Sequence, residues 1–228
     1  MRYESAESIK ENLILGIFSK ENDSFNFAES TCIKKGDFSL RPLLINDSRD
    51  AENETSFYVV GKEIMDILAM NETEILELAK KNSMEKYPGE MKLITDFLSV
   101  TEQTIIPDGI AIPQVYVLTN SQNCCGAAAL FYQPELLQNL ADYNSKDLAV
   151  FPANLNCVYC VPMANVEQLK EYQEMYAKAV QGVEHILSEN VLHYDLANKQ
   201  LKQLDGAVID LEQIQSVNRR RVHSAGGR

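Results

Sequence analysis

The stretch LAVFPANLNCVYCV, residues 148–161, is the part of this sequence that most clearly indicates the fold. Two short apolar runs lie on either side of Pro152 and the asparagines at 154 and 156. Apolar runs that flank a turn of this composition are typical of two antiparallel strands. The stretch therefore predicts a β-hairpin with strands at Leu148–Phe151 and Cys157–Val161.

The same pattern recurs along the chain. Gly36 supplies the positive φ that a tight turn needs, and we expect a hairpin around it. The expected strands are Phe25–Ile33 and Phe38–Ile45 beside that turn, then Phe57–Val60, Val115–Thr119, Ala127–Tyr132, Val191–Tyr194, Leu201–Leu204 and Ala207–Leu211.

Helices are indicated where apolar residues recur every three or four positions. Asn71 and Glu74 form a capping-box pattern that predicts a helix through Lys81. The apolar spacing from Asn165 to Leu187 predicts the longest helix. Further helices are expected at residues 3–18, Lys62–Met70, Met91–Leu98 and Pro134–Tyr143. The fold class is therefore α+β, with antiparallel hairpins packed against amphipathic helices and one long helix near the C-terminus.

The length of 228 residues suits one domain that buries roughly 70% of its unfolded surface. We expect residues 1–215 to form this single α+β domain. If it has two lobes, they divide near 99–113, where prolines and an Asp-Gly pair interrupt the pattern. Residues 216–228 lack apolar periodicity, and we expect them to form a disordered basic tail.

The charge of the chain limits its partners. The first 215 residues carry 17 basic and 33 acidic side chains, a net of −16, and the whole chain carries −12. A body with this net charge repels phosphate backbones, so we expect no nucleic acid to bind except through the basic tail at Arg219–Arg221. No uncharged stretch is apolar enough to span a membrane, so no membrane partner is expected.

The location of the protein is indicated by its cysteines and its N-terminus. Five cysteines, an odd number, do not suggest a secreted disulfide framework. Glutamates precede the first apolar run, where a secretion signal would carry basic charge. We therefore expect a cytoplasmic protein.

Four segments stand out when they are taken in order. They are VGKEIM at 60–65 with NETEILELAKKN at 71–82, VYVLTN at 115–120 with GAAA at 126–129, LAVFPAN at 148–154, and ILSENVLHYD at 186–195. Together they resemble a bacterial family of uncharacterised proteins, a domain of unknown function found in gut-type anaerobes. The resemblance covers about residues 57–201 and implies the fold of that family and a bacterial cytoplasmic setting.

The resemblance brings no established activity, cofactor or catalytic residue to this chain. The stretch between the first hairpin and Phe57 is shorter than in typical members, and the family pattern does not call for the cysteines at 124, 125, 157 and 160. No catalytic, cofactor-binding or metal-binding residue is assigned from it, and no cofactor is expected.

Cys157 and Cys160 have the spacing of a zinc knuckle or a redox pair, and Cys124 with Cys125 could complete four thiolates. Residues i and i+3 of a strand, however, point to opposite faces of the sheet. We therefore interpret these cysteines as buried apolar side chains. The acids at 47–54 lack the glycine and terminal glutamate of a calcium loop and are interpreted as a surface loop.

A small cysteine-dependent hydrolase is the alternative hypothesis. Cys124 or Cys125 would be its nucleophile, His185 or His193 its base, and Asp195 the group that orients the base. His193 and Asp195 share one face of an expected strand, although an exposed strand face gives the same pattern. No local sequence signature of such an enzyme surrounds either cysteine.

The leading hypothesis is a non-catalytic protein-interaction or regulatory module. The glycines form neither G-x-G-x-x-G nor G-x-x-x-x-G-K, so no nucleotide-binding loop is predicted. An acidic surface would help such a module to select its protein partner.

Overall fold

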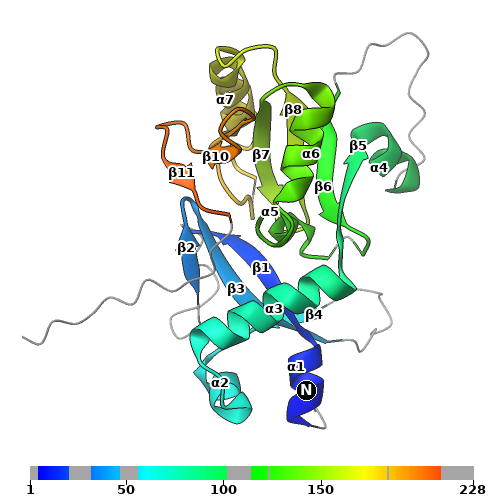
Figure 1. Cartoon of the computed structure of the whole chain (residues 1–228), viewed down its shortest axis with the longest axis vertical. Coiled ribbons are helices and arrows are strands. Elements are labelled where there is room, and N and C mark those ends of the chain that lie inside the picture. The colour runs from blue at the N-terminus through cyan, green and yellow to red at the C-terminus, as the bar shows by residue number, and fades with distance from the viewer. Residues whose placement is uncertain are drawn as a thin grey trace, which may run out of the picture.

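The computed structural model describes residues 5–20, 32–46, 56–101, 114–122, 124–183 and 185–211. These residues form two antiparallel β-sheets with helices beside them, so the fold is α+β as predicted (Figure 1). The expected basic tail at 216–228 lies outside the described residues, and so does most of the expected lobe boundary at 99–113. The acidic loop at 47–54 lies outside them as well.

The smaller sheet has four strands, arranged around β3. They are β1 (Leu13–Ser19), β2 (Ile33–Lys35), β3 (Phe38–Asn46) and β4 (Ser56–Val59). β1 pairs with one side of β3, and β2 and β4 pair with the other, all antiparallel. Gly36 has a φ of 60° between β2 and β3, which confirms the predicted turn. The expected start of the first strand, at Phe25, lies outside the described residues.

β1 replaces the second half of the helix expected at residues 3–18, which in the structure is α1 (Ala6–Glu11). The helix prediction was therefore wrong for this half. Alternate residues of β1 enter different cores: Leu13, Leu15 and Ile17 contact the main core, and Ile14 and Phe18 contact a second cluster. A strand buried on both faces is apolar at nearly every position, so it also satisfies helical spacing.

Two helices follow β4, as expected: α2 (Lys62–Leu68) and α3 (Glu72–Lys86). The predicted capping box is confirmed at the start of α3. Asn71 Oδ1 accepts the N–H of Glu74 at 3.0 Å, and Glu74 Oε2 accepts the N–H of Asn71 at 2.8 Å. α3 is therefore anchored at its first turn before it crosses the smaller sheet (Figure 1).

Two buried polar residues of α3 bind the backbone of the last turn of α1 and of the outer edge of β1. Asn82 Nδ2 donates to the carbonyls of Lys10 and Leu13, at 2.7 and 2.9 Å. Ser83 Oγ accepts the N–H of Leu15 at 2.8 Å. β1 is an end strand of its sheet, so these side chains satisfy groups that no neighbouring strand can reach.

The larger sheet has seven strands in the order β11-β10-β9-β7-β8-β6-β5, and every neighbouring pair is antiparallel. Its strands are β5 (Gly89–Leu93), β6 (Tyr116–Asn120), β7 (Leu148–Asn154), β8 (Cys157–Pro162), β9 (Leu192–Asp195), β10 (Gln200–Lys202) and β11 (Val208–Ile209). The predicted hairpin at 148–161 is confirmed as β7 and β8, and the closing hairpin as β9 and β10.

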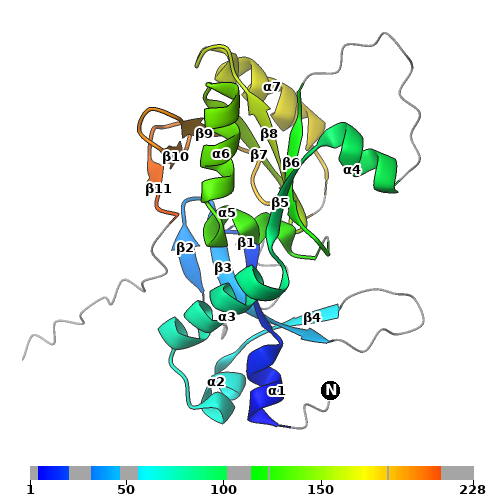
Figure 2. The same ribbon diagram turned by 45° about the vertical axis from the view of Figure 1, so that its right-hand side comes forward.

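Helices cover both faces of this sheet, α6 (Glu135–Asn144) on one side and α7 (Gln168–Ala179) on the other (Figures 1 and 2). Successive side chains of β7 point alternately toward α6 and toward α7. Leu148 and Val150 join the main core with residues of α6, whereas Ala149 and Phe151 pack with α7. The ring of Phe151 lies edge-on to Tyr176, with centroids 5.3 Å apart.

α7 is shorter than the helix expected at Asn165–Leu187, and the described helix with the most residues is α3. The prediction was wrong beyond Ala179. Gly182 has a φ of 75° and Val183 is exposed, whereas Leu187 is buried in the main core and not in the cluster under α7. The apolar spacing continues past the end of the helix by coincidence of sequence, since Val183 and Leu187 do not pack on the face that α7 buries.

Two other expected elements differ. Ala127–Tyr132 was expected to be a strand, but it forms the short helices η1 (Gly126–Ala128) and α5 (Ala129–Tyr132), which are fully buried. Met91–Leu98 was expected to be one helix, but it is divided between β5 and α4 (Ile94–Thr101). At Ala127–Tyr132 tertiary packing overrides local propensity, because an apolar run of this length fits a buried strand and a buried helix equally well.

Replacing Ser83 with alanine should leave the buried N–H of Leu15 without its acceptor. We expect a loss of about 1–3 kcal/mol in the free energy of unfolding, measured by urea titration. Ser121→Ala is the matched control, because Ser121 is exposed in the turn after β6, and it should change stability by less than about 0.5 kcal/mol. Equal losses in the two variants would contradict this role of Ser83.

Candidate functional site

Cys124 and Cys125 lie in a loop after β6 that is held by the side chain of Asn120. Asn120 Oδ1 accepts the N–H of Gln122 at 3.2 Å and that of Cys124 at 3.1 Å. Its amide donates to the carbonyl of Cys124 at 2.6 Å. Asparagine side chains that bond the backbone a few residues ahead stabilise turns of this kind. The last residue of β6 therefore shapes the loop that carries the cysteines.

The other side of this loop rests on the turn between β7 and β8. Asn156 Oδ1 accepts the N–H of Cys125 at 3.1 Å, and the Asn156 carbonyl accepts the hydroxyl of Thr119 at 2.9 Å. Gly126 approaches so closely that a Cβ atom there would lie 2.5 Å from the Asn156 oxygen. Cys125 has a left-handed backbone with a φ of 52°. Contacts from the end of β6 and from the β7–β8 turn therefore hold both cysteines.

The two thiols differ in their surroundings. Their Sγ atoms are 4.0 Å apart, within reach of an S–H···S hydrogen bond. Cys124 is partly exposed, whereas Cys125 is 2% exposed. The hydrogen bond with Cys125 lowers the pKa of the Cys124 thiol, and the same contact together with burial raises the pKa of Cys125. Cys124 is thus the thiol that ionises more readily.

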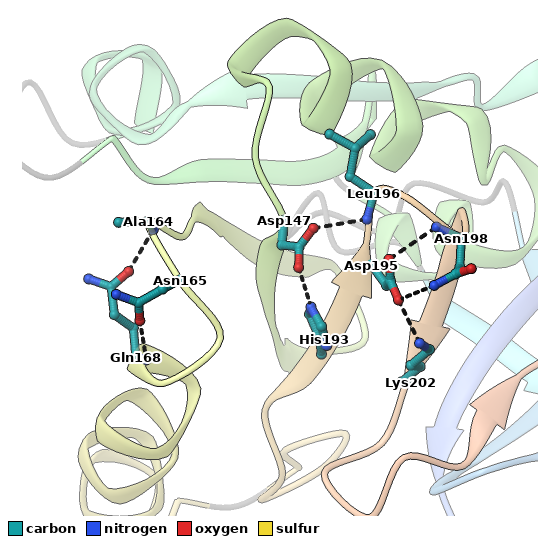
Figure 3. A network of polar contacts seen from close by, with 9 residues as sticks. All are labelled: Asp147, Ala164, Asn165, Gln168, His193, Asp195, Leu196, Asn198 and Lys202. Carbon is teal, nitrogen blue, oxygen red and sulfur yellow. Dashed lines mark hydrogen bonds and ion pairs between the residues drawn. The ribbon is translucent and has the colours of Figure 1, made fainter.

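His193 is paired with Asp147 and not with a cysteine (Figure 3). His193 Nε2 lies 2.8 Å from Asp147 Oδ2, and Asp147 Oδ1 accepts the N–H of Leu196 at 3.0 Å. Asp147 stands just before β7, and His193 is on the neighbouring strand β9. The pair therefore ties two adjacent strands of the larger sheet to the turn after β9.

Asp195, which the enzyme hypothesis used to orient the histidine, has other partners. It accepts from Lys202 Nζ at 2.6 Å and from Asn198, both from its amide at 2.7 Å and from its N–H at 3.0 Å (Figure 3). Lys202 lies diagonally across the β9–β10 hairpin from Asp195, two residues beyond Gln200, which is directly opposite. The side chain of Asp195 stabilises this hairpin and its turn.

His185 lines an apolar pocket of about 210 Å³ beside β1. Phe18, Phe57 and Leu155 line the same pocket, and they also pack in the hydrophobic cluster that contains the two cysteines. Neither cysteine is among the described residues that line the pocket. The structure therefore brings His185 to the same region as the thiol pair, with these apolar side chains shared between them.

Cys157 and Cys160 lie on β8, as expected, and both are buried. Cys157 bonds Asn154 Oδ1 through its N–H at 3.1 Å, whereas Cys160 is part of the main core. Burial raises the pKa of both thiols. Within the described part of the chain, no three His, Cys, Asp or Glu side chains converge as metal ligands would.

A groove that the sequence did not indicate lies between α6 and the strands β9 to β11. It encloses about 420 Å³ and has both polar and apolar walls. Its lining residues are Pro134, Glu135, Gln138, Tyr194, Lys199, Gln200, Leu201, Val208, Ile209, Asp210 and Leu211. These residues come from segments about 60 positions apart in the sequence, so only the tertiary structure brings them together.

A family model matches residues 1–196, and its description is a family of unknown function, DUF5688. The chain belongs to DUF5688. This confirms the resemblance to a family of unknown function found in the sequence. The DUF5688 match includes the thiol pair, Asp147, His193 and Asp195, whereas β10 and β11 follow it. No curated protein and no solved structure matches this DUF5688 chain. Among its described helices, none is long and apolar enough to cross a membrane.

The Asp195–Lys202 pair predicts a pH dependence of stability. The Lys202 ammonium and the Asn198 amide hold the pKa of the Asp195 carboxyl well below its usual range. The unfolded chain therefore binds a proton at higher pH than the folded one, and the stabilisation is lost as the pH falls below about 4.

In Lys202→Gln, the pKa of Asp195 should rise toward its ordinary value, and the fall in unfolding free energy below about pH 4 should become shallower. NMR titration of the carboxyl and urea titrations over this pH range measure the two effects. Lys199→Gln removes an exposed charge from the same hairpin turn and should leave both unchanged. A Lys202→Gln protein with an unchanged Asp195 pKa would refute this assignment.

Proposed function

We propose that this DUF5688 protein is a non-catalytic interaction or regulatory module, and that the groove beside β11 receives its protein partner. The groove is the observation that carries this proposal. Its volume of about 420 Å³ and its mixed polar and apolar lining suit the side chains of a bound segment. Val208 and Leu211 supply apolar walls, and Gln138 and Gln200 supply hydrogen-bonding groups.

The groove lies at the end of the larger sheet, which supports a partner that binds through a segment of extended chain. β11 is the last strand in the sheet order and pairs with β10. An end strand can add a strand from another chain through its backbone N–H and C=O groups. Val208, which lines the groove, is 53% exposed, and Leu204, between β10 and β11, is 43% exposed, so both offer apolar surface.

Charge supports a partner with basic side chains. Glu135 and Asp210 line the groove together with one basic residue, Lys199, and the chain as a whole carries a net charge of −12. Lys35 already neutralises part of this potential, because its ammonium lies 3.2 Å from Asp210. Glu135 therefore remains the acidic group best placed to select a lysine or arginine of the partner.

The proposed setting is a bacterial cytoplasm. All five cysteines are free thiols, which fits a reducing compartment. The cysteine-dependent hydrolase gains no support from the contacts described above, since His193 is paired with Asp147 and the Cys124 thiol with that of Cys125. The basic tail proposed for nucleic acid, Arg219–Arg221, lies outside the described residues.

Site-specific photo-crosslinking tests the groove. A photoreactive amino acid is placed at Val208 in the protein's native cells, and at Val183 as the matched control, since that valine is 52% exposed in the turn after α7. We expect a covalent adduct with one protein species from position 208 and none from position 183. The adducts are identified by mass spectrometry.

The captured protein, once purified, should bind the full chain directly. Val208→Glu should then weaken binding about tenfold or more, equivalent to about 1.4 kcal/mol, whereas Val183→Glu should leave the affinity unchanged. Adducts that form equally at both positions, or an affinity that is insensitive to Val208→Glu, would overturn the proposal. Isothermal titration calorimetry measures the affinities.

A further inference from the structure

We propose that Cys124 and Cys125 form a reversible site for thiol–disulfide exchange with small disulfide molecules. Cys124 is the attacking thiol, and Cys125 is the thiol that resolves the mixed disulfide. This site lies apart from the groove and does not depend on the proposed binding function. Its argument rests on the placement of the two sulfur atoms, on their unequal exposure and on the contacts that hold their loop.

The two sulfur atoms are already close, at 4.0 Å. A disulfide needs about 2.05 Å between them, so side-chain rotation must supply the remaining approach. The backbone on both sides is held by the side chains of Asn120 and Asn156. Hydrogen bonds hold the backbone of both cysteines in place. Only their side chains therefore have to move for the two sulfur atoms to meet.

Unequal exposure gives the two cysteines different roles. Cys124 is partly exposed, so a molecule from solvent can reach its sulfur atom. Cys125 is 2% exposed, so its sulfur atom is shielded from solvent by the protein. The lowered pKa of Cys124 favours its thiolate, which is the form that attacks a disulfide. Cys125, with its raised pKa, stays protonated until Cys124 has reacted.

The exchange balances in two steps. The Cys124 thiolate attacks one sulfur of a disulfide R–S–S–R, the R–S–S–R bond breaks, and the leaving thiolate takes up a proton. Cys125 then gives up its proton and attacks Cys124 Sγ, which forms the Cys124–Cys125 bond and expels the second thiolate. Two protein thiols are oxidised, and one small disulfide is reduced to two thiols.

The product should be easy to reduce again. The Cα atoms of adjacent residues are about 3.8 Å apart, closer than the roughly 4.4–6.8 Å of ordinary disulfides. A bond formed at this spacing is strained, and strained disulfides are the more reducible ones. The pair can therefore return to two thiols when the surrounding thiol pool is reduced.

Oxidation of the two cysteines would change the packing between the two sheets. Cys125 follows β6 of the larger sheet, but it packs in one cluster with Ile14 and Phe18 of β1 and Leu43 of β3. Phe18 also lines the apolar pocket that contains His185. A change at the thiol pair therefore reaches the packing of the smaller sheet and the wall of this pocket.

Mass spectrometry of the full chain tests the site. The reduced protein is incubated with oxidised glutathione, quenched with acid and digested with trypsin. Residues 93–146 lie between two consecutive lysines and contain Cys124 and Cys125 but no other cysteine. We expect this peptide to gain glutathione transiently and then to become lighter by two hydrogens than the starting peptide. A reducing dithiol should reverse the change.

Variants separate the two steps. Cys125→Ser should stop at the glutathione adduct on Cys124, and Cys124→Ser should leave this peptide unmodified. Cys32→Ser, at a partly exposed cysteine beside β2, is the matched control and should behave as the original chain does. The time course of the unaltered protein needs no variant, so the test holds even where a substitution disturbs folding.

Three results would overturn the proposal. The folded chain could keep a glutathione adduct on Cys124 without losing two hydrogens. It could react at Cys32 alone. The peptide at 93–146 could also be oxidised no faster in the folded chain than in the urea-unfolded chain, in which the loop contacts are absent.

Discussion

The close contact between Gly126 and the β7–β8 turn is the constraint on which the rest of this structure depends. A side chain at this position would overlap the carbonyl oxygen of Asn156 and the backbone nitrogen of Asn120. Only glycine lets the chain pass so close to the end of β6 and to the β7–β8 turn before it enters the buried helices η1 and α5. From there Phe131 reaches the smaller sheet, where its ring lies edge-on to Phe38 with centroids 6.0 Å apart. The two sheets thus share one core because this short segment fits between them.

Polar contacts reinforce the junction at both ends. The hydroxyl of Tyr132 donates to the carbonyl of Tyr87 at 2.8 Å, just before the larger sheet begins. Asp37, in the β2–β3 turn, accepts hydrogen bonds from Ser188, Asn190 and Gln203 at 2.6–2.9 Å. These bonds link the turn of one sheet to loops of the other. A charge-assisted hydrogen bond in such a place fixes orientation as well as adding stability.

The features with chemical potential are distributed around this junction. The thiol pair follows directly from the constraint, since Cys124 and Cys125 immediately precede Gly126 and their loop is held against the same turn. The groove lies at the other end of the larger sheet, where the final strands meet α6. His193 and Asp147 are used to join neighbouring strands. The thiol exchange and the partner binding that we propose would therefore use separate parts of the molecule.

Local patterns in the sequence were enough to determine the capping box at Asn71, the hairpin of β7 and β8 and the adjacency of the two thiols, because each depends on residues close together in the chain. The α+β class also followed from them. Local patterns could not decide between helix and strand at Leu13–Phe18 or at Ala127–Tyr132, since both segments are buried on all sides and apolar at almost every position. Only the tertiary structure could pair His193 with Asp147, 46 residues away, or form the groove between α6 and β11. Such contacts depend on how helices and strands pack against one another, and this packing cannot be read from the residues of one segment alone.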